Sequence, residues 1–184
     1  MRKELNLEFA TRVINHGPVV LVASLYDDKA NITPVAWTMP ISKKPPMVAL
    51  EIGRKHFIFE CIKKTKDFTV NIVSPEYVKD LLKCGKVSGR SVDKFDETSF
   101  SKSDSRVIKS PGLNEALAVM ECELIQDTYL EEEYNIIAGK VKYVEIEEGA
   151  FNEHWLFQDE KFKTVHHLGD RTFCFPDGKI IDIR

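Results

Sequence analysis

The sequence has no long hydrophobic run, no excess of one charge and no apolar signal core at its amino terminus. Its longest stretch without Asp, Glu, Lys or Arg is the 14-residue segment Val13–Tyr26, which polar and turn-forming residues interrupt at positions 15–18. That segment is too short to cross a bilayer as a helix. We therefore expect a cytoplasmic protein with no membrane segment.

The charge balance and the cysteines exclude two further classes of protein. The chain has 26 basic and 29 acidic residues and a net charge of −3, whereas nucleic-acid-binding proteins normally carry a basic face, so no nucleic-acid partner is expected. The four cysteines include no CxxC pair, which argues against a zinc ribbon or a redox dithiol. We expect buried thiols in a reducing compartment. A length of 184 residues, 43% of them hydrophobic, suits a single domain over residues 1–184.

Common catalytic motifs are also missing. The sequence contains no GxSxG, Walker, GxGxxG or HExxH motif. His166 and His167 are adjacent, so on a strand they would point to opposite faces and would not bind one metal ion. The acidic run Glu131–Glu133 is typical of a solvated turn. No metal site is expected.

Strand signals dominate what is present. Val19–Leu25 is a continuous apolar run, which indicates a strand buried on both faces. A second strand begins at Ala30 and leads into Asn31–Ser42, whose prolines 34 and 40 exclude a central strand or a helix throughout. Further strands are expected at residues 47–52, 68–72, 120–124 and 136–146, with a last hairpin across Pro176–Gly178.

Three helices are expected between these strands. They are predicted at Leu5–Asn15, at His56–Lys66 and from the cap Ser74 to Gly85, with a turn-rich segment following as far as Leu113. About seven strands joined by turns or single helices do not give a regular βαβ alternation. We therefore predict a mainly β fold with short helices (α+β), of the β-barrel type, rather than a doubly wound sheet.

Three loops contain the side chains that a phosphorylated, planar ligand needs. They are Asn31–Ser42, Gly53–His56 and Ser88–Phe95. Arg or Lys together with hydroxyl and backbone N–H groups would bind a phosphate, and Trp37, Pro34 or Phe95 would offer a flat wall for a ring system. From the residues alone, a core Trp37 and a surface Lys94 explain the same pattern.

These stretches, in this order, resemble the flavin reductase-like family, and the likeness covers about residues 17–175. The matching motifs are Asn31-x-Thr33-Pro34-x-x-Trp37, Pro40-Ile41-Ser42-x-x-Pro45-Pro46, Gly53-Arg54-Lys55, Phe68-x-Val70-Asn71, Ser88-Gly89 with Asp93-Lys94-Phe95, Gly139-x-Val141 and His167-Leu168-Gly169. The flavoredoxin-like branch is the most similar. The resemblance implies an FMN-binding split β-barrel and a homodimer that holds FMN near the subunit interface.

The resemblance also implies residue roles. Lys94 would approach the flavin, where charge develops on reduction, and His167 would lie near the ring or the nicotinamide pocket, which makes these two the candidate catalytic residues. Arg54 and the start of the helix after it would meet the phosphate. The implied cofactor-binding set is Asn31, Thr33, Pro34, Trp37, Thr38, Met39, Ser42, Gly53, Arg54, Lys55, Ser88, Gly89, Lys94 and Phe95.

Two positions depart from the family pattern. Ile58 stands where a threonine often contributes a phosphate hydroxyl, and Tyr134 stands where flavoredoxin-like members often have a histidine. Tyrosine still donates a hydrogen bond or stacks, but it supplies no imidazolium. Both changes bear on how tightly FMN is held.

The activity that the resemblance implies is oxidation of NAD(P)H by FMN, followed by electron transfer to a small-molecule or protein acceptor. The flavin supplies this chemistry, so no acid–base triad is required. Three alternatives remain open: an electron carrier that a protein partner reduces, a flavin-binding module without catalysis, and a pyridoxamine-phosphate-oxidase relative, which fits residues 31–46 less well. The sequence does not fix the acceptor or the choice between NADH and NADPH.

Overall fold

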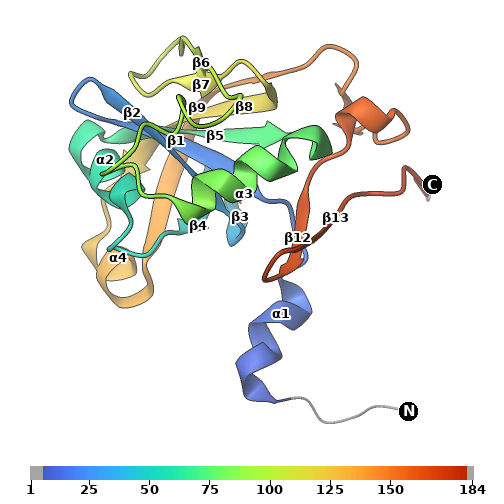
Figure 1. Cartoon of the computed structure of the whole chain (residues 1–184), viewed down its shortest axis with the longest axis horizontal. Coiled ribbons are helices and arrows are strands. Elements are labelled where there is room, and N and C mark those ends of the chain that lie inside the picture. The colour runs from blue at the N-terminus through green and yellow to red at the C-terminus, as the bar shows by residue number, and fades with distance from the viewer. Residues whose placement is uncertain (1–5, 182–184) are drawn as a thin grey trace.

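Seven antiparallel strands form the main sheet of the computed structural model, which describes residues 6–181 (Figure 1). Their order across the sheet is β2-β1-β5-β8-β9-β4-β3. The prediction of a mainly β fold with short helices is confirmed. The strands of this sheet are β1 (Val20–Tyr26), β2 (Lys29–Val35), β3 (Thr38–Lys43), β4 (Pro46–Glu51), β5 (Asp67–Val73), β8 (Ala116–Ile125) and β9 (Ile136–Ile146).

The two outermost strands explain why the sheet is curled. Strands β2 and β3 lie at opposite edges of the sheet, yet only Ala36 and Trp37 separate them in the sequence. Two residues span only about 10 Å at most, so the two edges must approach each other. Each edge strand contains a proline, Pro34 or Pro40, which has no N–H group to pair with a neighbouring strand. Residues 33–38, which bridge these edges, are called the seam below.

Strand β1 is buried on both faces, as the sequence predicts. Val20 and Val22 belong to one apolar cluster, which also contains residues of α2 (Phe57–Thr65), whereas Leu21 and Ala23 belong to a second cluster with residues of α3 (Val78–Lys86). The consecutive apolar residues Val20–Ala23 therefore stabilise two cores at once.

Strand β5 is also buried on both faces, although apolar and polar residues alternate along it. Its polar side chains bind the loop at residues 101–113: Thr69 Oγ1 donates to Pro111 O at 2.7 Å, and Asn71 Oδ1 accepts from Leu113 N at 3.0 Å. On the adjacent strand β8, the buried Glu121 carboxylate accepts from two backbone N–H groups of the same loop. This loop replaces water as the partner of the polar face.

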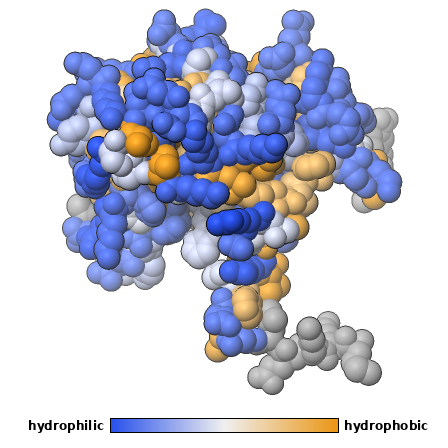
Figure 2. All heavy atoms as spheres, viewed as in Figure 1, coloured by the Kyte–Doolittle hydropathy of each residue, from blue (hydrophilic) through white to orange (hydrophobic). Residues whose placement is uncertain are grey.

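The first predicted helix is present as a 3₁₀ turn, Leu7–Phe9, followed by α1 (Ala10–Ile14), whereas Leu5 lies outside the described residues. Figure 1 shows α1 projecting from the rest of the chain, and Figure 2 shows apolar residues on it that continue onto the body. Accordingly, Ile14 is 81% exposed. No helix among residues 6–181 is long and apolar enough to span a membrane.

The shorter elements complete the chain. The remaining helix is α4 (Thr128–Tyr134), and two 3₁₀ turns occupy Pro75–Tyr77 and Glu160–Phe162. Three small two-stranded sheets pair β6 (Lys102–Ser103) with β7 (Gly112–Leu113), β10 (Phe151–Asn152) with β11 (His154–Trp155), and β12 (His166–Gly169) with β13 (Thr172–Cys174).

Three local predictions are wrong. Helix α3 includes Gly85 and ends one residue later, at Lys86; a Cβ at position 85 would lie 3.1 Å from Pro34 Cγ, so glycine lets the helix approach the seam. The last hairpin joins β12 to β13 through Asp170, whose φ of 50° makes the tight turn, and not through residues 176–178. The run 131–133 belongs to helix α4, where Glu131 is buried and pairs with Lys63 of α2.

Candidate functional site

Three cavities meet at the seam. The first, called the seam cavity, has a volume of about 230 Å³ and lies between the end of β2 and the segment that leads into α2. It brings together four predicted ligand-binding residues, Thr33, Pro34, Trp37 and Gly53. Its lining is completed by Val35, Ala36, Glu51, Ile52 and His56.

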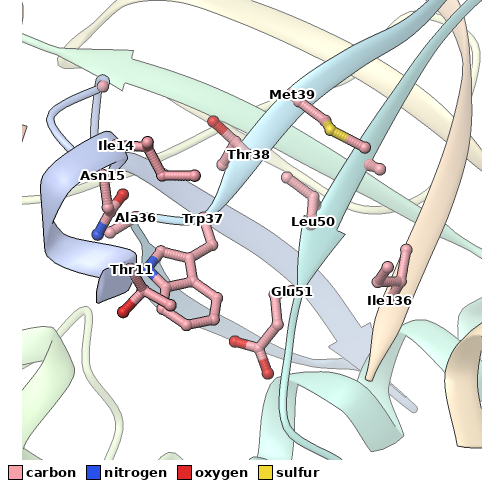
Figure 3. Close-up of a pocket in the computed structure, with 12 residues that line it drawn as sticks. Thr11, Ile14, Asn15, Ala36, Trp37, Thr38, Met39, Leu50, Glu51 and Ile136 are labelled. Atoms are coloured by element: carbon pink, nitrogen blue, oxygen red, sulfur yellow. The ribbon is translucent and has the colours of Figure 1, made fainter. Parts of the chain in front are cut away.

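The second cavity, of about 350 Å³, lies on the other side of Trp37 and is lined by two more predicted residues, Thr38 and Met39 (Figure 3). Figure 3 shows the Trp37 ring between the end of α1 and Glu51. When the Asn15 amide is oriented so that both of its groups are paired, it accepts from Trp37 Nε1 at 2.8 Å. Trp37 is 46% exposed, so it is not a core residue. It lines both the seam cavity and this second cavity.

The third cavity, of about 320 Å³, lies between α3 and the β12–β13 hairpin and is called the hairpin cavity. It shares Pro34 and Ala36 with the seam cavity, so the two are direct neighbours. The predicted catalytic residue His167 lines it. The hairpin therefore places His167 beside the seam, although 130 residues separate it from Trp37 in the sequence.

The amino-terminal end of α2 borders the seam cavity through Gly53 and His56. His56 is the N-cap residue and has extended backbone, but its side chain makes no capping hydrogen bond. Arg54 and Lys55 are exposed just before it. An uncapped helix start with two adjacent cations is a favourable place for an anion, because its N–H groups and its dipole both attract negative charge.

Ile58, the first departure from the family pattern, is fully buried in the core cluster of α2. Its side chain therefore faces the apolar interior and is separate from any ligand at the helix start. Tyr134, the second departure, is 53% exposed at the end of α4 and packs edge-on against Tyr129, with ring centroids 5.8 Å apart.

Lys94 is buried at 4% exposure, and its ammonium group is fully engaged within the protein. Its Nζ donates to Cys84 O at 2.7 Å, to Ile32 O at 2.8 Å and to Thr33 Oγ1 at 3.2 Å. Burial lowers the pKa of Lys94. Since an ammonium has three N–H bonds, these three acceptors account for all of its donors, and its nearest link to the seam cavity is Thr33.

Asn31 lies under the Ser88–Gly89 loop. It is 2% exposed, and neither its side-chain nitrogen nor its oxygen has a hydrogen-bond partner among the described residues. A Cβ at Gly89 would lie only 2.0 Å from Asn31 Oδ1, so this close packing requires glycine. Ser88 itself is exposed, and its Oγ accepts from Arg90 N at 3.3 Å.

Two of the predicted cofactor-binding residues, Ser42 and Phe95, lie away from the seam. They belong to the eight that line none of the three cavities, which are Asn31, Ser42, Arg54, Lys55, Ser88, Gly89, Lys94 and Phe95. Ser42 lies at the far end of β3, opposite Met47 in the β3–β4 pairing. Phe95 packs against the second core cluster, with the Lys102 ammonium 5.2 Å from its ring centroid. Neither lines any of the three cavities at the seam.

Glu51, His56, Lys86 and Arg171 are among the lining residues that were not predicted individually as site residues. Glu51 and His56 lie directly beside predicted residues, so the position of Gly53 was a usable signal for them. Lys86 and Arg171 both line the hairpin cavity, but no short motif contains them. Only the packing of α3 against the β12–β13 hairpin brings these last two together.

Comparison with known proteins agrees with this architecture. The flavin reductase like domain matches residues 13–166. An uncharacterised Escherichia coli protein, YddH, is 35% identical over 174 residues, which cover 92% of each chain.

Solved structures show the same fold. An FMN-binding domain of a flavin reductases-like enzyme from Shewanella baltica superposes with a TM-score of 0.86 at 20% identity, covering 98% of this chain and 96% of the other. Flavoredoxin of Desulfovibrio vulgaris gives a TM-score of 0.85 at 21% identity, covering 99% and 97%. These matches confirm the split-barrel fold, and the chain belongs to the flavin reductase-like family.

Proposed function

We propose that this chain binds FMN at the seam and transfers electrons from NAD(P)H, through the flavin, to an acceptor. The observation that carries the proposal is the uncapped start of α2 beside the seam cavity. There Arg54, Lys55 and free helix N–H groups suit the phosphate, and the cavity they adjoin suits a ring system. Two structural neighbours are described by names that include FMN or flavoredoxin, which supports the same assignment.

The residues at the seam would divide the work of binding. Trp37 and Pro34 supply flat apolar walls, and Thr33 supplies a hydroxyl for the polar edge of the ring. The Asn31 amide is buried next to the seam residue Thr33 in strand β2 and has no partner among the described residues, so its hydrogen-bonding capacity is unused without a ligand. FMN, when bound, supplies the hydride and electron chemistry, so the protein has to orient the reactants and exclude water.

Lys94 would act on the flavin through Thr33. Because Thr33 Oγ1 accepts a hydrogen bond from Lys94 Nζ, its own hydroxyl proton is free to point into the seam cavity. Thr33→Val and Lys94→Met should then each weaken FMN binding, and the double variant should bind no more weakly than the poorer single variant. Additive losses would show that Lys94 contacts the flavin independently of Thr33.

A second copy of the chain is the partner we propose, in a homodimer. An apolar cavity of about 550 Å³ opens on the sheet, between β3 and the β10–β11 hairpin. Met39, Val144 and Phe151 line it and are 54%, 57% and 46% exposed. Met39 also lines the cavity of about 350 Å³ next to Trp37, so a dimer formed here would place FMN near the interface. Sedimentation equilibrium tests this, and a monomer at micromolar concentration would contradict it.

The decisive experiment is the visible spectrum of the chain after incubation with FMN and desalting, followed by anaerobic addition of NADH or NADPH. Retained flavin bands that bleach with either nucleotide are the expected result. Retained bands that do not bleach would favour a carrier that a protein partner reduces. Riboflavin serves as the control, because it has the same ring without the phosphate. Equal retention of both compounds would contradict the phosphate site at α2.

A further inference from the structure

The loop that follows α3 lies against two elements of the seam cavity. Residues 88–92 of this loop are called the lid below. A Cβ at Gly89 would lie 2.0 Å from Asn31 Oδ1 and 3.1 Å from Phe57 Cδ1, so the lid is in close contact with both side chains. Asn31 points to the same face of β2 as Thr33, which lines the cavity, and Phe57 is the first residue of α2. The lid therefore covers the corner where β2 meets the start of α2.

The lid is a compact unit between two fixed points. Its own hydrogen bonds close a tight turn, in which Ser88 O accepts from the backbone N–H groups of Ser91 and Val92 at 3.1 and 3.2 Å. Before the lid, α3 is helical as far as Lys86. After it, Lys94 is held by three hydrogen bonds to acceptors of β2 and α3. Residues 88–92 can therefore move as one piece without disturbing either neighbour.

One exposed ion pair ties the lid to α2. Arg90 Nη1 donates to Glu60 Oε2 at 2.6 Å, and Arg90 Nη2 donates to Glu60 Oε1. The guanidinium also lies 5.1 Å from the centroid of the Phe57 ring. Within residues 6–181, these are the only hydrogen bonds from the lid to another element. The Arg90 and Glu60 side chains are 46% and 42% exposed, so water and salt weaken their attraction.

The closed lid leaves an unpaired amide beneath it. Asn31 is 2% exposed, and neither its side-chain nitrogen nor its oxygen has a partner among the described residues. An amide buried in this way is less stable than one that water reaches. Lifting the lid would hydrate the amide but would break the ion pair between Arg90 and Glu60. These two effects oppose each other, and an exposed ion pair contributes little, so the closed lid is held only weakly.

We propose that residues 88–92 open to admit and release the flavin, and that the Arg90–Glu60 ion pair is the latch that keeps them closed. This rests on the proposed function, because the ligand that the lid retains is the FMN assigned to the seam. Arg90 and Glu60 are positioning residues, which act through the lid and not by contact with the flavin. The latch stabilises the closed lid with or without flavin. Its loss should therefore raise the rates of FMN uptake and release by the same factor and leave the affinity unchanged.

Opening of the lid is measured first without flavin, by thiol labelling at position 31. Asn31→Cys in a Cys174→Ser background replaces the covered amide by a thiol, and the other three thiols are buried. The reagent is the uncharged 4,4′-dithiodipyridine. Glu60→Gln and Arg90→Gln should each raise the labelling rate about two- to fivefold. High salt should raise the rate when the latch is intact and should have little effect when it is absent.

Uptake and release of FMN are then followed by stopped-flow fluorescence in chains without the labelling substitutions. Glu60→Gln and Arg90→Gln should each raise both rates about two- to fivefold, and the double variant should be no faster than the faster single variant, because both remove the same ion pair. Lys64→Gln is the matched control. Lys64 also belongs to α2, lies 4.1 Å from the ring centroid of Tyr26 and forms an exposed ion pair with Asp27, away from the lid. It should change neither the labelling rate nor the FMN rates.

The outcomes separate the latch from a direct contact with the flavin. Faster release with unchanged uptake would mean that Arg90 or Glu60 binds the flavin itself, and would overturn the latch. Unchanged labelling in both variants, or an equal increase in Lys64→Gln, would overturn it as well. If the parent chain retains no FMN, the proposed flavin function fails, and labelling at position 31 still decides whether the ion pair controls opening of the lid.

Discussion

Two buried asparagines show the difference between the structural and the functional side of this molecule. Asn71 on β5 is 0% exposed and Asn31 on β2 is 2% exposed, and β1 lies between their strands. The Asn71 amide donates to Leu21 O at 3.0 Å and to Thr69 Oγ1 at 2.9 Å, and it accepts from Leu113 N. The Asn31 amide has no partner among the described residues.

The same contrast extends to the regions around them. Near Asn71, carboxylates and hydroxyls of β5 and β8 bind the 101–113 loop, so burial costs little there. Around the seam, by contrast, the Asn31 amide and His167 Nδ1 have no partner among the described residues, and the start of α2 has no side-chain cap. Unpaired buried polar groups lower the stability of the folded protein, and a ligand that binds them raises it again.

The largest effect should come from exchanging each asparagine for leucine. Asn71→Leu should lower the free energy of unfolding by about 2–3 kcal/mol, because Leu113 N loses its buried acceptor. Asn31→Leu should change it by less than about 1 kcal/mol, because no internal hydrogen bond is lost, while FMN affinity falls. Urea denaturation measures both. Equal losses in the two variants would show that Asn31 is a structural residue.

Gly89→Ala should have the next largest effect. It should lower the free energy of unfolding by about 1–3 kcal/mol, because the added methyl group would overlap Asn31 Oδ1. Gly17→Ala is the control, since nothing lies within 4 Å of a Cβ there. Adding Asn31→Ala to Gly89→Ala should recover part of the loss by making room. Thermal unfolding of these three variants and the parent chain checks this, and the absence of any recovery would place the clash elsewhere.

Replacement of both Arg54 and Lys55 by serine should weaken FMN binding about tenfold, or ~1.4 kcal/mol, and leave riboflavin binding unchanged. Both residues are exposed, so the fold should persist. Lys79→Ser, an exposed cation on α3, is the control for overall charge. Fluorescence titration with each flavin gives the two affinities. An equal loss of riboflavin affinity would mean that these cations do not contact the phosphate.

The smallest effects concern the thiols. Burial raises the pKa of Cys84 to about 11 and the pKa values of Cys61 and Cys122 to about 12. In the folded protein only Cys174, which is half-buried, should react quickly with a thiol reagent at pH 8. All four should react in denaturant. Fast reaction of more than one thiol under native conditions would contradict the packing of these cores.

The same pKa shifts predict a pH dependence of stability. Unfolded cysteines release their protons near the ordinary pKa of 9.0, whereas the folded thiols keep theirs to about 11 or 12. The unfolded state therefore binds fewer protons in this range. The contribution of these buried thiols to the free energy of unfolding should be fully present below pH 9, and the free energy of unfolding should fall as the pH rises towards 11. Urea titrations at pH 8 and pH 10 compare the two conditions.

Much of the fold followed from local patterns. The apolar run at 19–25 predicted a strand with two buried faces, and the prolines at 34 and 40 excluded central strands, which matches their places at the two sheet edges. Where prediction failed, a distant contact decided the outcome. Gly85 provides close packing against Pro34 and does not end the helix, and the buried Glu131 pairs with Lys63 of α2.

The candidate site was predictable only in part. Thr33, Pro34, Trp37 and Gly53 were expected and do gather at one cavity, whereas Ser42 and Phe95 point to other parts of the fold. Lys86 and Arg171 carry no signal in the sequence. Their proximity depends on α3 and a hairpin that are 85 residues apart.

Local patterns were enough to predict most strands of the main sheet and the main helices, and an ordered set of motifs indicated the family, because hydrophobic periodicity and turn residues act over short distances. Which buried polar groups find partners depends on contacts between distant segments. Pairing of Asn71 depends on a loop 42 residues away, and the open seam depends on two sheet edges that meet across a two-residue link. Local periodicity does not specify contacts between segments this far apart in the chain.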